Sequence, residues 1–147
     1  MTIVVPFDGT DLSKAALVRA DEFGAALDEP LVVVTIIPNA NREYARDNGW
    51  LTGGEQFDLG SIVSSLSRQV AETSPVAVFE YEVVDRYAPP GSIARHIRNY
   101  AKEFNARLVV LGSENAGRIV TSLSSVGGSI ASDSAYDVLI VRHVDSM

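Results

Sequence analysis

The stretch "VPFDGTDLSKAAL", residues 5–17, decides the fold, because it joins an apolar strand to a helix through a tight turn. Asp8 ends the strand, Gly9 permits a sharp change of direction, and the apolar spacing of a helix follows. Thr10 or Asp11 can cap that helix, since both side chains accept hydrogen bonds from free N–H groups of a first turn. A strand that leads directly into a helix is the first half of a β-α-β unit.

Short apolar runs rich in β-branched residues recur along the chain and predict strands. There are five of them, at residues 2–7, 31–38, 77–84, 106–112 and 137–143. Four are almost continuously apolar, which is typical of strands covered on both faces. The run 77–84 instead alternates, with Glu80 and Glu82 between apolar residues. We therefore expect this strand at an edge of the sheet, with one face in water.

Helical spacing of apolar residues marks the segments between the runs. It links Leu12, Ala16, Ala20, Phe23 and Leu27, then Leu59, Ile62, Val63, Leu66 and Val70, and then Ile93, Ala94, Ile97, Tyr100, Ala101 and Phe104. We expect the third helix to begin after the prolines of "APPGS" (88–92), with Ser92 or Gly91 as its cap. A short fourth helix is expected over residues 125–134.

Strands that alternate with helices predict an α/β protein, in which right-handed crossovers connect parallel strands. Five strands and four helices give a doubly wound three-layer sandwich around a five-stranded parallel sheet. A chain of 147 residues fits one domain, which we expect to span residues 1–147.

Charge and composition exclude several classes of partner. The net charge of −7 argues against a nucleic-acid-binding surface, which would need clustered Lys and Arg. The apolar runs are far shorter than the roughly 20 residues that cross a bilayer. The chain has no cysteine, and its two histidines, His96 and His143, lack metal-ligand spacing. We expect an acidic cytoplasmic protein without a metal site and without nucleic-acid or membrane partners.

Ligands of such sheets bind beyond the carboxyl ends of the strands, where the strand order reverses. Three segments are expected to meet there: the turn at Asp8, the end of the second strand at 36–38, and the loop "LGSENAGRIVTSLSSV" at 111–126. That loop leaves a buried strand through glycines, small residues and hydroxyls. Backbone N–H groups of such a loop can hold an anion, above all where a helix follows.

Three stretches resemble the universal stress protein family in order and spacing. "VPFDGT" resembles the end of the family's first strand, "NARLVVLGSE" its fourth strand and nucleotide loop, and "VLIVRH" its last strand. The resemblance covers essentially the whole chain. It implies a Rossmann-like sheet in strand order 3-2-1-4-5 and a crevice for ATP or another adenine nucleotide.

The family's nucleotide loop reads glycine, two residues, glycine, nine residues, glycine, then serine or threonine. Gly112 matches the first glycine, whereas Asn115 and Ser124 stand in the places of the other two. Ser125 and Val126 match the residues that follow. Together with the first turn, the resemblance implies a site made of Pro6, Asp8, Gly9, Thr10, Ile36, Gly112, Asn115, Gly117, Ser124, Ser125 and Val126.

These departures leave two functions open. A glycine lets the backbone approach a phosphate closely and adopts positive φ freely, whereas serine and asparagine are more restricted. The first function is a stress-response regulatory domain that binds ATP weakly, with Mg²⁺ only alongside the nucleotide. The second is a dimeric interaction module that binds no nucleotide. A third function, a slow ATPase, is the least expected, because the sequence offers no general base and no Walker lysine.

The last predicted strand, 137–143, is expected to form a homodimer. It runs without charge from Val138 to Val141, and an open apolar edge is a template for pairing with another chain. The family resemblance implies the same arrangement.

The segment 39–54 carries Trp50, the only tryptophan of the chain. Long segments near a switch point are often lids. Trp50 is therefore expected to cover the crevice, to contact a partner or to pack locally on the surface.

Overall fold

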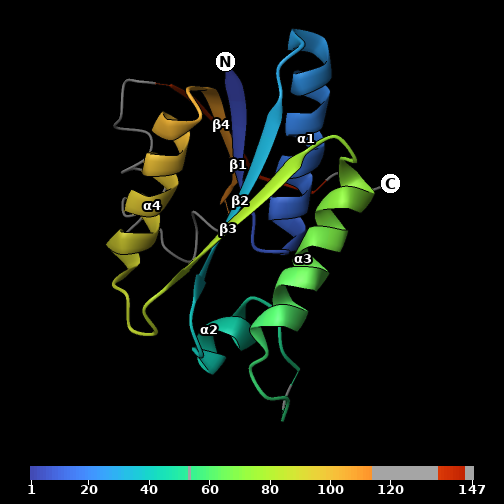
Figure 1. Cartoon of the computed structure of the whole chain (residues 1–147). Coiled ribbons are helices and arrows are strands. Elements are labelled where there is room, and N and C mark those ends of the chain that lie inside the picture. Colours follow the sequence, from blue (N-terminus) through green and yellow to red (C-terminus); the bar gives the residue numbers. More distant parts are fainter. Residues whose placement is uncertain (53, 114–135, 145–147) are drawn as a thin grey trace.

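Five parallel strands form a single sheet in the order β3-β2-β1-β4-β5. This confirms the strand order that the family resemblance implies. The computed structural model describes residues 1–52, 54–113 and 136–144. The strands in chain order are β1 (Thr2–Pro6), β2 (Leu31–Pro38), β3 (Val78–Val84), β4 (Ala106–Gly112) and β5 (Asp137–Val141) (Figure 1).

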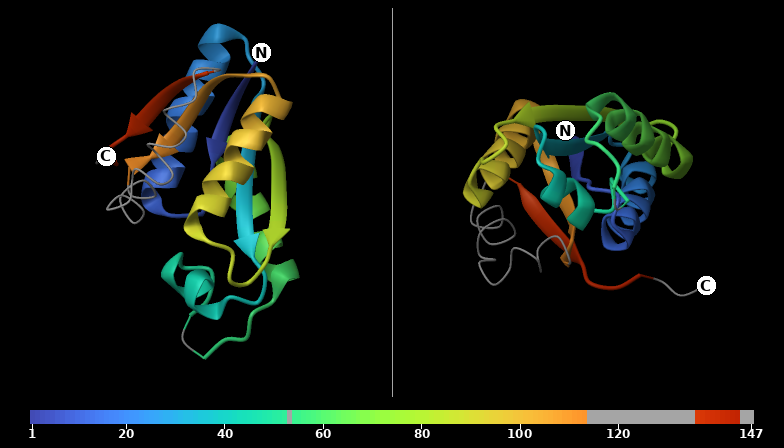
Figure 2. Two further views of the ribbon diagram at one scale, coloured as in Figure 1. Left: turned by 90° about the vertical axis from the view of Figure 1, so that its left-hand side faces the viewer. Right: turned by 90° about the horizontal axis from the view of Figure 1, so that it is seen from below.

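Helices cover both faces of the sheet, which gives the three layers expected from the sequence. Viewed along the strands, α1 and α3 lie on one face and α4 lies on the other (Figure 2). No helix in the described residues has the length and apolarity of a membrane span. The expected fourth helix, over 125–134, lies outside those residues. The described helices are α1 (Asp11–Leu27), α2 (Arg42–Asp47), α3 (Leu59–Thr73) and α4 (Pro90–Glu103).

The two central strands are buried along their whole length, because helices pack on both of their faces. Alternate side chains of β1 point to opposite faces. Ile3 and Val5 belong to the apolar cluster under α1 and α3, and Val4 belongs to the cluster under α4. The carboxyl end of β1 is therefore held rigidly between two cores.

The buried stripe of α1 differs from the expected one at its end. Phe23 and Leu27 are 36% and 40% exposed. The buried positions are Ser13, Ala16, Leu17 and Ala20. The next position of this stripe is Gly24, where an added Cβ would lie 3.2 Å from the backbone oxygen of Glu29. Gly24 faces the returning chain, so the bulky neighbours Phe23 and Leu27 lie outside the core.

The start of α4 also corrects the sequence prediction. The cap is Pro89, and Pro90 is the first helical residue, so neither Ser92 nor Gly91 is the cap. Proline suits this position because its fixed φ matches a helix and its missing N–H would have no partner there. The backbone N–H of Ser92 bonds to Pro89 O at 2.8 Å within this first turn.

Strand β3 lies at the edge of the sheet, as its alternating pattern predicts. The more exposed face is not the one that carries the glutamates. Glu82 is half-buried under α4, with its carboxylate 3.1 Å from His96 Nδ1, whereas Tyr81 and Val83 on the other face are 44% and 39% exposed. Glu82 has a histidine partner on α4, and α3 leaves the apolar side chains of the other face only partly covered.

Gly112, the last residue of β4, packs directly against the start of α1. A Cβ at this position would lie 2.9 Å from the backbone carbon and oxygen of Leu12. Backbone atoms of a buried helix cannot move aside easily, so a glycine is required here. The close approach ties the end of β4 to the turn that follows β1.

Replacing Gly112 with alanine is expected to lower the free energy of unfolding by about 1–3 kcal/mol, the usual effect of overpacking. Urea denaturation followed by circular dichroism measures this change. Gly91→Ala is the matched control, because an added Cβ at Gly91 meets nothing within 4 Å and alanine suits a helix better. Equal stability of Gly112→Ala and the wild type would contradict the packing argument.

Candidate functional site

Asp8 lies at the carboxyl end of β1 and is only 5% exposed. Its Oδ1 accepts hydrogen bonds from the backbone N–H of Thr10 at 3.0 Å and from the Thr10 hydroxyl at 2.6 Å. Its Oδ2 is buried and has no hydrogen-bond partner among the described residues. One carboxylate oxygen therefore builds the turn, and the other takes no part in it.

The turn itself is fixed by Gly9 and Thr10. Gly9 has φ +83°, a conformation that side chains disfavour, and an added Cβ would lie 3.2 Å from both Leu66 and Gln69 of α3. Thr10 is the cap of α1, and its side chain accepts from the N–H of Ser13 at 3.3 Å. The sequence prediction for both residues is confirmed, with Thr10 rather than Asp11 as the cap.

Two side chains from other segments complete the surroundings of this turn. The indole N–H of Trp50 donates to the backbone oxygen of Asp8 at 2.7 Å. The amide Oε1 of Gln69 is buried and has no hydrogen-bond partner among the described residues. Sequence reasoning missed Gln69, because a single polar residue on the face of a helix carries no local signal.

The end of β2 is held to β1 by a buried hydroxyl. Thr35, 2% exposed, donates to the backbone oxygen of Phe7 at 2.6 Å. The side chain of Ile36 is 5% exposed and belongs to the apolar cluster under α4. Contact of Ile36 with a ligand through its backbone stays a prediction. Thr35 was also missed, since it reads as an ordinary β-branched strand residue.

The described residues of the predicted site come from three neighbouring strands. Pro6 ends β1 and is followed by Asp8, Gly9 and Thr10, Ile36 lies in β2, and Gly112 ends β4 beside the first turn of α1. The sheet order reverses between β1 and β4, so this is the switch point. The other residues of the predicted site lie outside the described residues, and their convergence stays a prediction: Asn115, Gly117, Ser124, Ser125 and Val126.

The segment between β2 and α3 continues the surface of the site. It contains α2, a helix that the sequence did not predict, and it lines a hollow of about 810 Å³ together with the start of α3. Trp50, Phe57 and Asp58 are among the lining residues. Hydrogen bonds from the hydroxyl and backbone N–H of Ser61 lower the pKa of the exposed Asp58 carboxyl, so this wall keeps its negative charge near neutral pH.

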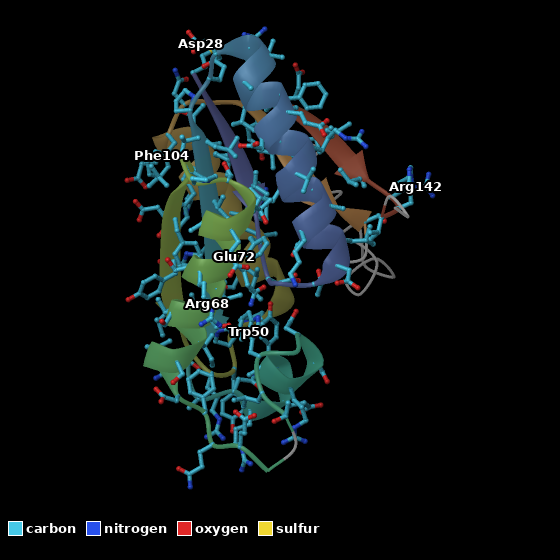
Figure 3. All side chains as sticks on the ribbon, turned by 90° about the vertical axis from the view of Figure 1, so that its right-hand side faces the viewer. Asp28, Trp50, Arg68, Glu72, Phe104 and Arg142 are labelled. Carbon is cyan, nitrogen blue, oxygen red and sulfur yellow. The ribbon has the colours of Figure 1, made fainter. Side chains whose placement is uncertain are left out.

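Trp50 packs locally, which is one of the alternatives raised by the sequence, and a role in covering a crevice stays a prediction. It packs partly against the apolar core, and its ring lies edge to face with that of Tyr44, with the ring centroids 5.6 Å apart. Its indole also reaches the turn at Asp8. Figure 3 shows Trp50 near the lower end of the sheet, level with the start of α1 and above α2.

No group of three or more metal-ligating side chains occurs within residues 1–52, 54–113 and 136–144. The available polar atoms are instead hydrogen-bonding groups. Asp8 Oδ2 can accept from a hydroxyl or an amine, and the close packing at Gly9 and Gly112 fixes the backbone around it. This arrangement suits a binding site for a small polar ligand.

The parallel doubly wound sheet, whose strand order reverses between β1 and β4, defines the Rossmann-like class of α/β domains. Residues 1–142 match the profile of the universal stress protein family. The chain belongs to this family, as the resemblance in its sequence predicts.

Solved structures of family members share the fold over almost their whole length. A universal stress protein in complex with cAMP is 26% identical, with a TM-score of 0.61, over 99% of this chain and 98% of its own. The universal stress protein UspA from Lactobacillus plantarum is 20% identical, with a TM-score of 0.66 and 97% of each chain covered. A protein from Archaeoglobus fulgidus in complex with dAMP is 20% identical, with a TM-score of 0.56, over 96% and 97%. No curated protein gave a significant match.

Removal of the Thr10 hydroxyl is expected to weaken the turn. Thr10→Val keeps the shape of the side chain but loses the cap and the bond to Asp8, so the free energy of unfolding should fall by about 1–2 kcal/mol. Urea denaturation measures the change. Thr73→Val, which removes a hydroxyl bonded within α3, serves as control and should change stability by less than about 0.5 kcal/mol. Equal effects of the two variants would show that Thr10 has no special role.

Proposed function

We propose that this protein is a stress-response regulatory domain that binds an adenine nucleotide in the crevice between the ends of β1 and β4. The observation that carries the proposal is the buried Oδ2 of Asp8, which has no hydrogen-bond partner in the part of the chain that the structure describes. Binding changes the interactions of the domain, and no chemical step on the nucleotide is part of the proposal.

The buried carboxylate oxygen favours a ligand with a hydrogen-bond donor. A polar atom buried without a partner costs free energy, and a ligand that donates to it recovers that cost. A nucleotide offers such donors on its ribose hydroxyls and on the exocyclic amine of adenine. The negative charge of Asp8 places the phosphates away from this oxygen, toward the loop that follows Gly112.

The comparisons support the choice of nucleotide. The relative that is 26% identical over 99% of this chain was solved with cAMP. That ligand contains an adenine base, a ribose and one phosphate, so it carries the donors that Asp8 requires. Asn115 and Ser124, which replace glycines of the family loop, should weaken contacts to the phosphates. We therefore expect AMP and cAMP to compete well with ATP, and Mg²⁺ to bind only with ATP.

The test is a calorimetric titration of the purified protein with AMP, cAMP and ATP, the last with and without Mg²⁺. The nucleotide content of the denatured protein is measured first, so that a copurified ligand is recognised. Saturation with about 100 times Kd of nucleotide should stabilise the fold by about 2.7 kcal/mol, which is visible as a higher melting temperature.

Asp8→Asn is the matching variant, because it keeps Oδ1 for the turn and replaces the free acceptor with a donor. We expect its nucleotide affinity to fall by about tenfold or more, the effect of losing a hydrogen bond to a charged group. Asp28→Asn makes the same change of charge at the exposed C-terminus of α1 and should bind like the wild type. A wild-type protein that binds none of these nucleotides would refute the proposed function and favour the dimeric interaction module.

A homodimer through β5 is the second part of the proposal. Within the described residues this strand pairs only with β4, and its Ile140 side chain is 40% exposed. An apolar edge strand of this kind readily pairs with a second copy about a two-fold axis. A dimer would protect the edge and let two crevices influence one another.

Ile140→Lys is expected to give a monomer, since it forces a charge into the proposed seam. Light scattering after size exclusion measures the mass of each variant. Val76→Lys, at a position that is 82% exposed between α3 and β3, should leave the dimer intact. A wild-type protein that is monomeric at micromolar concentration would contradict the dimer.

A further inference from the structure

We propose that Trp50 is a positioning residue for the nucleotide crevice and couples the segment 39–58 to the turn at Asp8. The inference rests on the proposed nucleotide site and names a means of regulating it. Trp50 acts through the backbone oxygen of Asp8, to which its indole N–H donates at 2.7 Å.

The bond supplies a donor to a backbone carbonyl group that has no strand partner at the end of β1. The parallel pairing of β1 with β2 ends at Pro6, so the carbonyl groups of Phe7 and Asp8 need other donors. Thr35 supplies the first with its hydroxyl, and Trp50 supplies the second with its indole. Two successive carbonyl groups are therefore fixed by side chains from outside β1, and the orientation of the Asp8 carboxylate depends on both.

The indole is held firmly enough to act as a support. The backbone N–H of Trp50 donates to the Ala45 oxygen of α2 at 2.8 Å, and the neighbouring Leu51 is only 6% exposed. Ala45 is fully buried in the cluster under α1 and α3. Trp50 thus links α2 directly to the Asp8 turn.

The same link has a consequence for regulation. If a shift of the segment 39–58 changes the free energy of nucleotide binding, then nucleotide binding changes the free energy of that shift by the same amount. The outward side of α2 carries exposed charged residues, so its movement would alter a charged surface: Arg42, Glu43, Arg46 and Asp47. Nucleotide binding in the crevice therefore changes the exposed surface of the segment between β2 and α3.

The decisive variant is Trp50→Phe, which keeps an aromatic ring but removes the N–H donor. We expect its affinity for AMP to fall about tenfold, as for the loss of one hydrogen bond to a partly buried group. Tyr100→Phe removes one polar atom from a half-buried aromatic residue under the opposite face of the sheet and should bind AMP like the wild type. Calorimetry measures the affinities, and thermal melts measure the stability of each variant. A Trp50→Phe protein that is less stable but binds AMP within twofold of the wild type would overturn the proposal.

Two further measurements separate this inference from the proposed function. In the absence of nucleotide, hydrogen exchange at the Thr10 amide, which bonds to Asp8 Oδ1, should become faster in Trp50→Phe but not in Tyr100→Phe. Unchanged exchange would overturn the positioning role even if no nucleotide binds to the wild type. In the wild type, the fluorescence of Trp50, the single tryptophan, should change with the same Kd as the calorimetric titration. Binding of AMP without any fluorescence change would overturn the coupling while leaving the proposed function intact.

Discussion

The hydrogen bonds between Asp8 and Thr10 set the geometry on which the rest of the site depends. They bend the chain at the end of β1 so that α1 begins immediately and packs back along the sheet. The bend brings Leu12 against Gly112, which ties the end of β4 to the same place. A single local interaction thus defines the start of α1 and its contact with the end of β4, and it uses only one of the two Asp8 carboxylate oxygens.

The elements that the sequence predicted correctly are those in which local chemistry and burial agree. β1 and β2 are apolar throughout because both of their faces are covered, and the Gly9–Thr10 turn has the residues that its backbone conformation and its cap require. The stripes of α3 and α4 were also predicted, since packing against a flat sheet selects one side of each helix. Such features need no knowledge of distant contacts.

The errors arise where a distant segment decides the outcome. Phe23 lies outside the core because Gly24 faces the returning chain, and Glu82 is half-buried because His96 of α4 lies opposite. The bond from Trp50 to Asp8 joins residues separated by 42 positions, so no local pattern could reveal it. The sequence predicted that Asp8 and Gly112 lie at the ends of β1 and β4, and their binding of a ligand stays a prediction. The polar neighbours from α3 and β2 required the three-dimensional structure.

The claim that Asp8 is the ligand-binding acceptor is tested most directly by a crystal structure of the protein with AMP. We expect Asp8 Oδ2 to lie within about 3.2 Å of a ribose hydroxyl or the adenine amine, with the Thr10 bonds to Oδ1 retained. AMP bound elsewhere, or bound in the crevice with Oδ2 still lacking a partner, would contradict it.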